Sequence, residues 1–191
     1  TGVGGRLLDM LRRQGFHTSA NSLGPDGMVK GTALDNNPVW TIPVKDPQVF
    51  DRYSSVGPSM INLIKSLNGV GTEDDSLLGE TWSSKSSQAL FEYEKSMEFA
   101  ELFDTPDFNM DHYKVEKGVN ERFRATAQYM KMRTLRKVNR EVFIIPHEGF
   151  DSHSEQKADV NTLFSTANTA LTRFVDEMKV QGIWENVVII M

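Results

Sequence analysis

The hydrophobic pattern is clearest in the carboxyl-terminal part of the chain. An apolar run at residues 142–146 leads into a polar turn at 147–153, and a second apolar run occupies residues 187–191. Between them, residues 155–181 place apolar side chains at the i, i+3, i+4, i+7 spacing of an amphipathic helix, and Gly182 can end that helix in a left-handed conformation. The pattern predicts a strand, a helix and a second strand, which together make a parallel βαβ unit over residues 140–191.

The helix predicted over residues 155–181 has one continuous apolar face. Ser152 or Ser154 can cap its amino end. Burying its larger apolar side chains at about 1.5–3 kcal/mol each would stabilise docking by roughly 10–20 kcal/mol before the entropy cost. We expect this face to pack on the sheet that the two apolar runs form. The positions on the face are Val160, Leu163, Phe164, Ala167, Leu171, Phe174, Val175 and Met178.

Both apolar runs are rich in β-branched residues and nearly continuous, which is typical of strands covered on two faces. The predicted fold class is therefore α/β, with a mostly parallel sheet flanked by helices. Two strands cannot provide that cover, and few other segments resemble buried strands. We expect an incomplete domain, in which the missing strands lie before Thr1 and after Met191 or come from a partner chain at the sheet edge.

Residues 1–139 are interpreted as a helical and loop-rich region of the same partial domain, which spans residues 1–191. Two short extended pieces are predicted near residues 17–22 and 39–44, within a stretch rich in Gly, Pro, Asn and Asp. We interpret that stretch as an excursion packed over the core. The predicted helices of this region cover residues 5–14, 60–67, 87–103 and 120–137.

Composition and charge restrict the class of partner. The formal net charge is −5, which argues against binding to a phosphate backbone, so no nucleic acid partner is expected. One basic cluster lies near the end of the helix predicted at 120–137, where cations complement the helix dipole, and we interpret it as a solvated face. The cluster consists of Lys131, Arg133, Arg136, Lys137 and Arg140.

Three further features limit the setting of the protein. No stretch approaches the roughly 20 apolar residues that cross a bilayer. The chain contains no cysteine, which excludes disulfides and thiolate metal sites. No signal peptide is recognisable, and because the chain begins at Thr1 rather than Met, we expect the natural amino terminus to precede it.

Candidate chemistry follows the first apolar run. Asp151 and His153 stand two residues apart between a predicted strand end and a helix start. Carboxylate and imidazole are ligands that suit Zn, Mn or Fe, and residues two apart in an extended turn point the same way. His147 at the strand tip and Gln156 in the first helical turn are candidate substrate-binding residues. In open α/β sheets, ligands bind beyond the carboxyl ends of the strands.

Each of these residues also has a purely structural interpretation. Asp151 and Ser152 are ordinary helix-capping residues, Gln156 is an ordinary residue of a first helical turn, and a histidine in a loop is commonly a surface residue. A second Asp/His pair, Asp111 and His112, lies in a long connection and is a weaker candidate. The spacing leaves the metal-site and capping interpretations both open.

A family resemblance adds to this pattern. The block Glu148-Gly149-Phe150-Asp151-Ser152-His153-Ser154-Glu155-Gln156 resembles the Gly-Gly-Phe-Asp-Thr-His-Ser-x-Gln motif of the domain of unknown function 1501, within the alkaline phosphatase and sulfatase superfamily. The segment from Gly182 to Met191 is similar to a Gly-hydrophobic-Trp-Asp-x-Val-Val-Val stretch of that family, and the opening Thr1–Asp9 resembles its Thr-Gly-Trp-Leu-Gly-Arg block. Glu148 and Val3 depart from the family residues at their positions.

The resemblance implies a sulfatase-like fold in which Asp and His side chains hold one or two divalent cations. Asp151 and His153 match the family block and become candidate ligands, with Zn, Mn or Ca as the ion. The family's Gly-Asn-Asp-Gly, Ser-Glu-Phe-Gly-Arg and Asp-His-Gly motifs are absent from this sequence. The chain is therefore expected to hold only part of a metal site and to show no catalysis by itself. Members of the family are usually exported, which implies an extracellular setting.

Two functions remain open from the sequence. The first is a fragment of a metal-dependent hydrolase of phosphate or sulfate esters. The second is a non-catalytic sulfatase-like binding or structural subunit of a larger assembly, with a partner strand at its open sheet edge.

Overall fold

Three parallel strands form the sheet of this α/β protein, in the order β2-β1-β3. β1 is Thr18–Ser22, β2 is Val39–Thr41 and β3 is Arg140–Ile144. The register pairs Ala20 of β1 with Val39 of β2 and with Val142 of β3. The two extended pieces predicted near 17–22 and 39–44 are confirmed as strands, but the first of them is the central strand and not an excursion over the core.

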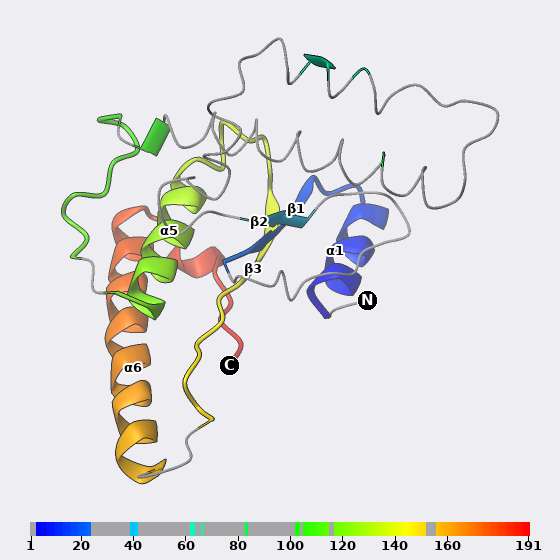
Figure 1. Cartoon of the computed structure of the whole chain (residues 1–191). Helices are drawn as coiled ribbons and strands as arrows, with labels where there is room; N and C mark the ends of the chain where they lie inside the picture. The colour runs from blue at the N-terminus through cyan, green and yellow to red at the C-terminus, as the bar shows by residue number, and fades with distance from the viewer. Residues whose placement is uncertain are drawn as a thin grey trace. The chain divides into compact units, whose positions relative to one another are not determined.

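The computed structural model describes residues 3–23, 39–41, 62–63, 66, 83, 102–103, 105–114, 117–151 and 156–191. The chain divides into two compact units, one formed by Thr1–Val44 with Thr105–Met191 and the other by Lys45–Asp104. All the helices and strands discussed below belong to the first unit (Figure 1). The helices predicted at 60–67 and 87–103 lie almost entirely outside the described residues.

The second strand of the predicted βαβ unit is where the structure differs from the expectation. A 3₁₀ turn, η2, covers Trp184–Asn186, and residues 187–191 form no strand. Val188 and Ile190 of this apolar run are 84% and 88% exposed. The parallel neighbour of β3 is instead β1. Residues 18–22 and 39–41 therefore supply part of the sheet that the sequence analysis expected from segments outside the chain.

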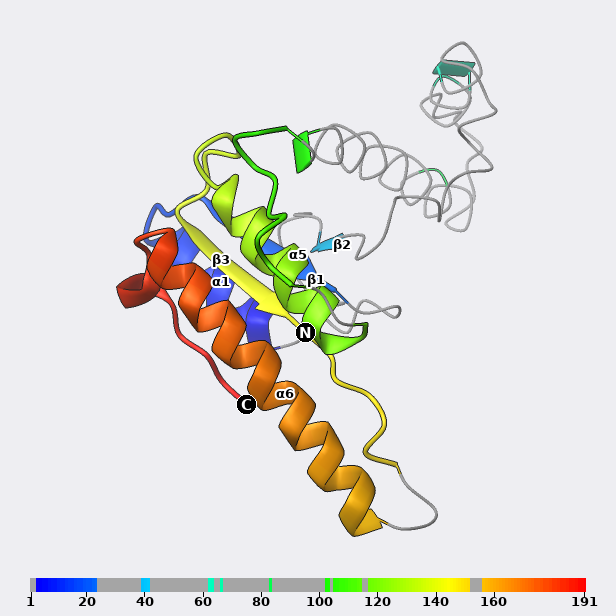
Figure 2. The ribbon, with the colours of Figure 1, turned by 90° about the vertical axis from the view of Figure 1, so that its left-hand side faces the viewer.

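Helices lie on both faces of the sheet, as the nearly continuous apolar pattern of β3 predicts. Because side chains alternate along a strand, Val142 and Ile144 face one side and pack with Leu8 of α1, Val3–Arg13. Phe143 faces the other side, where its ring meets the ring of Tyr129 of α5, Val119–Lys131, edge to face with centroids 6.3 Å apart. Figure 2 shows α5 and α1 on opposite sides of β3.

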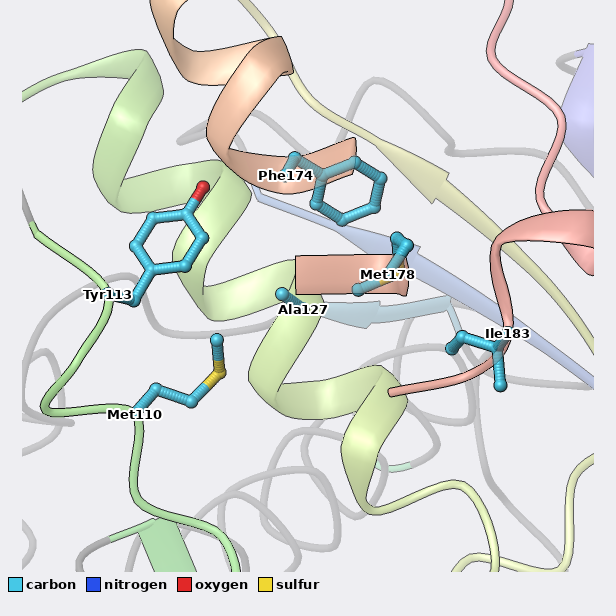
Figure 3. Close-up of a cluster of buried hydrophobic side chains, with 6 residues drawn as sticks. All are labelled: Met110, Tyr113, Ala127, Phe174, Met178 and Ile183. Atoms are coloured by element: carbon cyan, nitrogen blue, oxygen red, sulfur yellow. The ribbon is translucent and has the colours of Figure 1, made fainter. Parts of the chain in front are cut away.

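The long helix α6, Gln156–Val180, lies within one residue of its predicted bounds at each end, and Gly182 takes the predicted left-handed conformation with φ 67°. Its packing differs from the prediction, because its main partner is α5 rather than the sheet. Phe174 and Met178 of α6 are buried with Ala127 of α5 (Figure 3). Met110, Tyr113 and Ile183 complete this cluster. Phe164, on the predicted apolar face, is 61% exposed.

A polar network explains how a strand as polar as β1 is buried. Asn21 of β1 is fully buried and donates from its Nδ2 to the Glu141 carboxylate of β3 at 3.3 Å. Arg136 donates two hydrogen bonds to the same carboxylate, at 2.5 and 2.8 Å. The Cζ atom of its guanidinium lies over the Tyr129 ring, 3.9 Å from the ring centroid. Arg136 is therefore not part of a solvated basic face, since its side chain is only 5% exposed.

Candidate functional site

The candidate site is the loop from Ile145 to Asp151, which leaves the carboxyl end of β3 and leads toward α6. Arg122 of α5 holds the start of this loop through a hydrogen bond to the carbonyl oxygen of Pro146. The same guanidinium pairs with the Glu148 carboxylate at 3.2 Å. Glu148 is 66% exposed, so the backbone contact contributes more to fixing the loop than the ion pair does.

His147 is the predicted substrate-binding residue at the strand tip, and its ring nitrogen Nε2 lies 3.0 Å from the carbonyl oxygen of Leu163 in α6. Its ring also meets Phe150 edge to face, with centroids 5.3 Å apart, and Phe150 in turn meets Phe164 at 5.6 Å. These contacts attach the loop to the amino-terminal half of α6. In this arrangement Nε2 of His147 is used for the contact with the Leu163 carbonyl.

Gly149 shows why the loop needs a glycine at that position. Its φ of 101° lies in a region that side-chain-bearing residues rarely adopt. A Cβ there would also stand 3.2 Å from a terminal methyl of Leu163. The close approach of the loop to α6 therefore depends on this residue, which directly precedes Phe150 and Asp151.

Of the two predicted metal ligands, the structure describes only Asp151. Asp151 is exposed, at the end of the loop. His153 lies outside the described residues, as do the capping candidates Ser152 and Ser154. Gln156 is the first residue of α6, and its side chain is likewise outside the description. Of the predicted site residues, His147 and Asp151 therefore lie in the same loop after β3. Asp151 stands five residues before Gln156, where α6 begins. Within the described ranges, no three His, Asp or Glu side chains are grouped closely enough to hold a metal ion.

A second polar site joins the connection before α5 to α6. Nε2 of His112 lies 2.7 Å from the Glu177 carboxylate, and Glu177 is buried at 4% exposure. Gln181 donates to the other oxygen of Glu177 at 2.9 Å and to the carbonyl of Ala127 at 3.1 Å. The sequence singled out Asp111 and His112 as a pair, but the partner of His112 is Glu177, which is 65 residues away in the sequence.

Sequence reasoning missed both Arg122 and Glu177. Glu177 left only a weak signal, because it stands between the apolar positions Phe174 and Met178, and a carboxylate buried beside such residues requires a partner. Arg122 left none, since an arginine in a polar helix turn usually faces water.

A small parallel sheet between helices, with a polar loop at the carboxyl end of one strand, places the chain among α/β proteins whose ligand sites form beyond the strand ends. The family model described as protein of unknown function (DUF1501) matches residues 41–191, and the chain belongs to this family. The match includes β3, the candidate loop and α6. Neither the curated proteins nor the solved structures contain a match. No helix in the described part of the chain is both long and apolar enough to span a bilayer.

Proposed function

We propose that the chain is part of a metal-dependent hydrolase of phosphate or sulfate esters, of sulfatase-like fold, and that Asp151 and His153 are two of its metal ligands. The observation that carries the proposal is the position of Asp151. It is an exposed carboxylate at the far end of the loop that leaves the carboxyl end of a parallel strand, inside the motif by which the chain resembles its family. Ligand sites of α/β proteins form at such strand ends.

The donor set fits a divalent cation. A carboxylate oxygen from Asp151 and an imidazole nitrogen from His153 are suitable ligands for zinc or manganese. A divalent cation held there would supply positive charge to polarise an ester of phosphate or sulfate. The chain's own contribution is to fix the loop: Arg122 anchors the Pro146 carbonyl and His147 anchors the loop to Leu163. Together with the contact of Phe150 on Phe164, these contacts hold the part of the loop that precedes Asp151.

The alternative is a non-catalytic sulfatase-like scaffold. The observation that favours it is that His147 and Glu148 both make packing contacts within the unit. In that case the loop serves to join β3 to α6, Asp151 and Ser152 are capping residues of the helix, and His153 is a surface residue.

Metal titration by calorimetry tests the proposal without requiring catalysis from this chain. The wild-type chain is titrated with Zn²⁺ and Mn²⁺, beside Asp151→Ala and His153→Ala. Loss of a side chain that binds the metal directly is expected to weaken binding by about tenfold or more. Asp111→Ala is the matched control, because it removes the carboxylate of the other Asp/His pair and is expected to leave the affinity unchanged.

The outcomes separate the two functions. Binding that is weakened by both ligand variants and not by the control supports the metal site. Equal affinity in Asp151→Ala and wild type removes the site, and absence of binding by the wild-type chain favours the scaffold. Hydrolysis of p-nitrophenyl phosphate or sulfate that requires Asp151 would further identify the ester class.

A further inference from the structure

We propose that four side chains between α5 and α6 form a binding site for a small oxyanion such as phosphate or sulfate. Asn120 and Arg124 lie on α5, Arg173 lies on α6, and Tyr113 lies in the connection before α5. The site uses none of the residues assigned to the proposed metal site, so each of the two sites can be tested without the other.

Contacts between the two helices and the connection bring these side chains together. Nη1 of Arg173 donates to Oδ1 of Asn120 at 3.4 Å, and to the carbonyl oxygen of Lys114 at 3.3 Å. Lys114 directly follows Tyr113 in the sequence. Asn120 and Arg124 stand four residues apart on α5, so they share one face of that helix. Residues that are far apart along the chain therefore meet at one place.

The electrostatic environment of Tyr113 places its hydroxyl near both arginines. Burial raises the pKa of this hydroxyl to about 12, whereas the charges of Arg173 and Arg124 lower it and the charge of Glu177 raises it. Coulomb interactions weaken with distance, so these charged groups lie near the hydroxyl. In Figure 3 the hydroxyl points away from Met110, which lies at the other end of the ring.

Three of the four side chains carry a buried donor that has no partner within the described residues. These atoms are the hydroxyl of Tyr113, Nδ2 of Asn120 and Nε of Arg124. Asn120 is fully buried, and Tyr113 is 6% exposed. Buried polar groups in folded proteins are nearly always hydrogen-bonded. Three unpaired donors near one another therefore indicate an acceptor that these residues do not supply themselves.

The charge of the site favours an anion as that acceptor. Arg124 is half-buried, and within the described residues its guanidinium has no carboxylate partner. Glu177, the acidic group near the same hydroxyl, already accepts a hydrogen bond from Gln181 and contacts His112. Asn120 lies in the first turn of α5, where the helix dipole also favours negative charge.

The size of the site restricts the class of anion. Phosphate and sulfate carry several acceptor oxygens, and guanidinium groups bind such oxygens with charge-assisted hydrogen bonds. Because the three unpaired donors are buried, the site takes a small free ion rather than an anionic group on a macromolecule. Arg124 and Arg173 are only half-buried, so the ion enters past these two long side chains.

Calorimetric titration of the intact chain with inorganic phosphate and with sulfate tests the proposal. A chelator keeps the proposed metal site empty, and chloride holds the ionic strength constant. Arg124→Met removes one positive charge, and Tyr113→Phe removes only the hydroxyl. Each variant is expected to bind the anion about tenfold more weakly or worse, because hydrogen bonds to a charged group are strong.

Arg133→Met is the charge-matched control. Arg133 is also a half-buried arginine, it follows the end of α5, and its Nη1 donates to the carbonyl oxygen of Met130 at 3.1 Å. The control removes the same charge from the molecule without touching the site. Its affinity for phosphate and sulfate is expected to equal that of the wild-type chain.

The outcomes decide the proposal. Weaker binding in both site variants, with wild-type affinity in the control, supports the site. Absence of binding by the wild-type chain overturns it and leaves ordered water as the partner of the buried donors. Wild-type affinity in either site variant also overturns it, as does an equal loss in the control, which would show that net charge alone attracts the anion. Circular dichroism checks the fold of Arg124→Met.

Discussion

Glu141 is the residue on which the polar layer of the sheet depends. It accepts bonds from Arg136 and from Asn21, and its side chain is 10% exposed. Glu141→Gln removes the negative charge and leaves the buried guanidinium without a counterion. Breaking one partner of a buried pair costs about 3–5 kcal/mol, so we expect the free energy of unfolding in urea to fall by that amount.

The matched control is Glu148→Gln. Glu148 also pairs with an arginine, Arg122, but it is 66% exposed and water screens the interaction. A change within about 1 kcal/mol is expected. Equal losses in the two variants would show that the Arg136 pair contributes no more than a surface pair.

A second prediction for a single residue concerns Gly149. Gly149→Ala forces a side chain into a conformation with φ 101° and against the Leu163 methyl at 3.2 Å. Strain of this kind costs about 1–3 kcal/mol. We expect lower stability together with a changed chemical shift for the His147 ring in NMR spectra, since that ring bonds the Leu163 carbonyl. An unchanged ring signal would show that the loop tolerates the side chain.

At the scale of elements, α6 combines a buried half and an exposed half in one helix. Phe174 is 4% exposed and meets the Phe123 ring of α5 at 5.2 Å, whereas Phe164 is 61% exposed. Phe174→Ala is expected to lower the free energy of unfolding by about 3–5 kcal/mol through the lost apolar contacts and the cavity left behind.

Phe164→Ala is the comparison on the same helix, with the same side chain removed. A loss well under that of Phe174→Ala, about 1 kcal/mol or less, is expected because the Phe164 side chain is largely exposed to water and its ring meets Phe150 at the surface. Urea unfolding of both variants measures the difference. Comparable losses would mean that the amino-terminal half of α6 is covered in solution.

At the scale of the whole molecule, two buried tyrosines link stability to alkaline pH. Burial raises the pKa of both Tyr113 and Tyr129 to about 12, despite nearby arginines that act in the opposite direction. An unfolded tyrosine ionises near 10, so between about pH 10 and 12 the unfolded chain has lost protons that the folded chain retains. Their contribution to stability is therefore complete below pH 10 and is lost as the pH rises toward 12.

Absorbance titration of tyrosinate measures this directly. Two of the four tyrosines are expected to ionise near pH 12 in the folded chain. Tyr113→Phe should remove one of these late transitions and weaken the alkaline loss of stability. At neutral pH the variant is expected to be at least as stable as wild type, because the Tyr113 hydroxyl is buried without a hydrogen-bond partner in the structure. A late transition unchanged in Tyr113→Phe would contradict the assignment.

The candidate loop shows where sequence reasoning reaches its limit. Its place between an apolar strand and a long helix followed from periodicity, because the alternation of burial in a strand and in a helix is local. The contacts that hold it, from Arg122 and from His147 to Leu163, join residues far apart in the sequence, and their polar side chains could equally have faced water.

The sequence by itself determined the class of the fold, the bounds of α6 to within one residue and the strand at β3 to within two, because those depend on spacing along one segment. Tertiary structure alone decided which strand pairs with β3, which surface α6 covers and where Glu141 and Glu177 find their partners. These choices depend on competition among segments for the same apolar surface. No local pattern records the outcome of that competition.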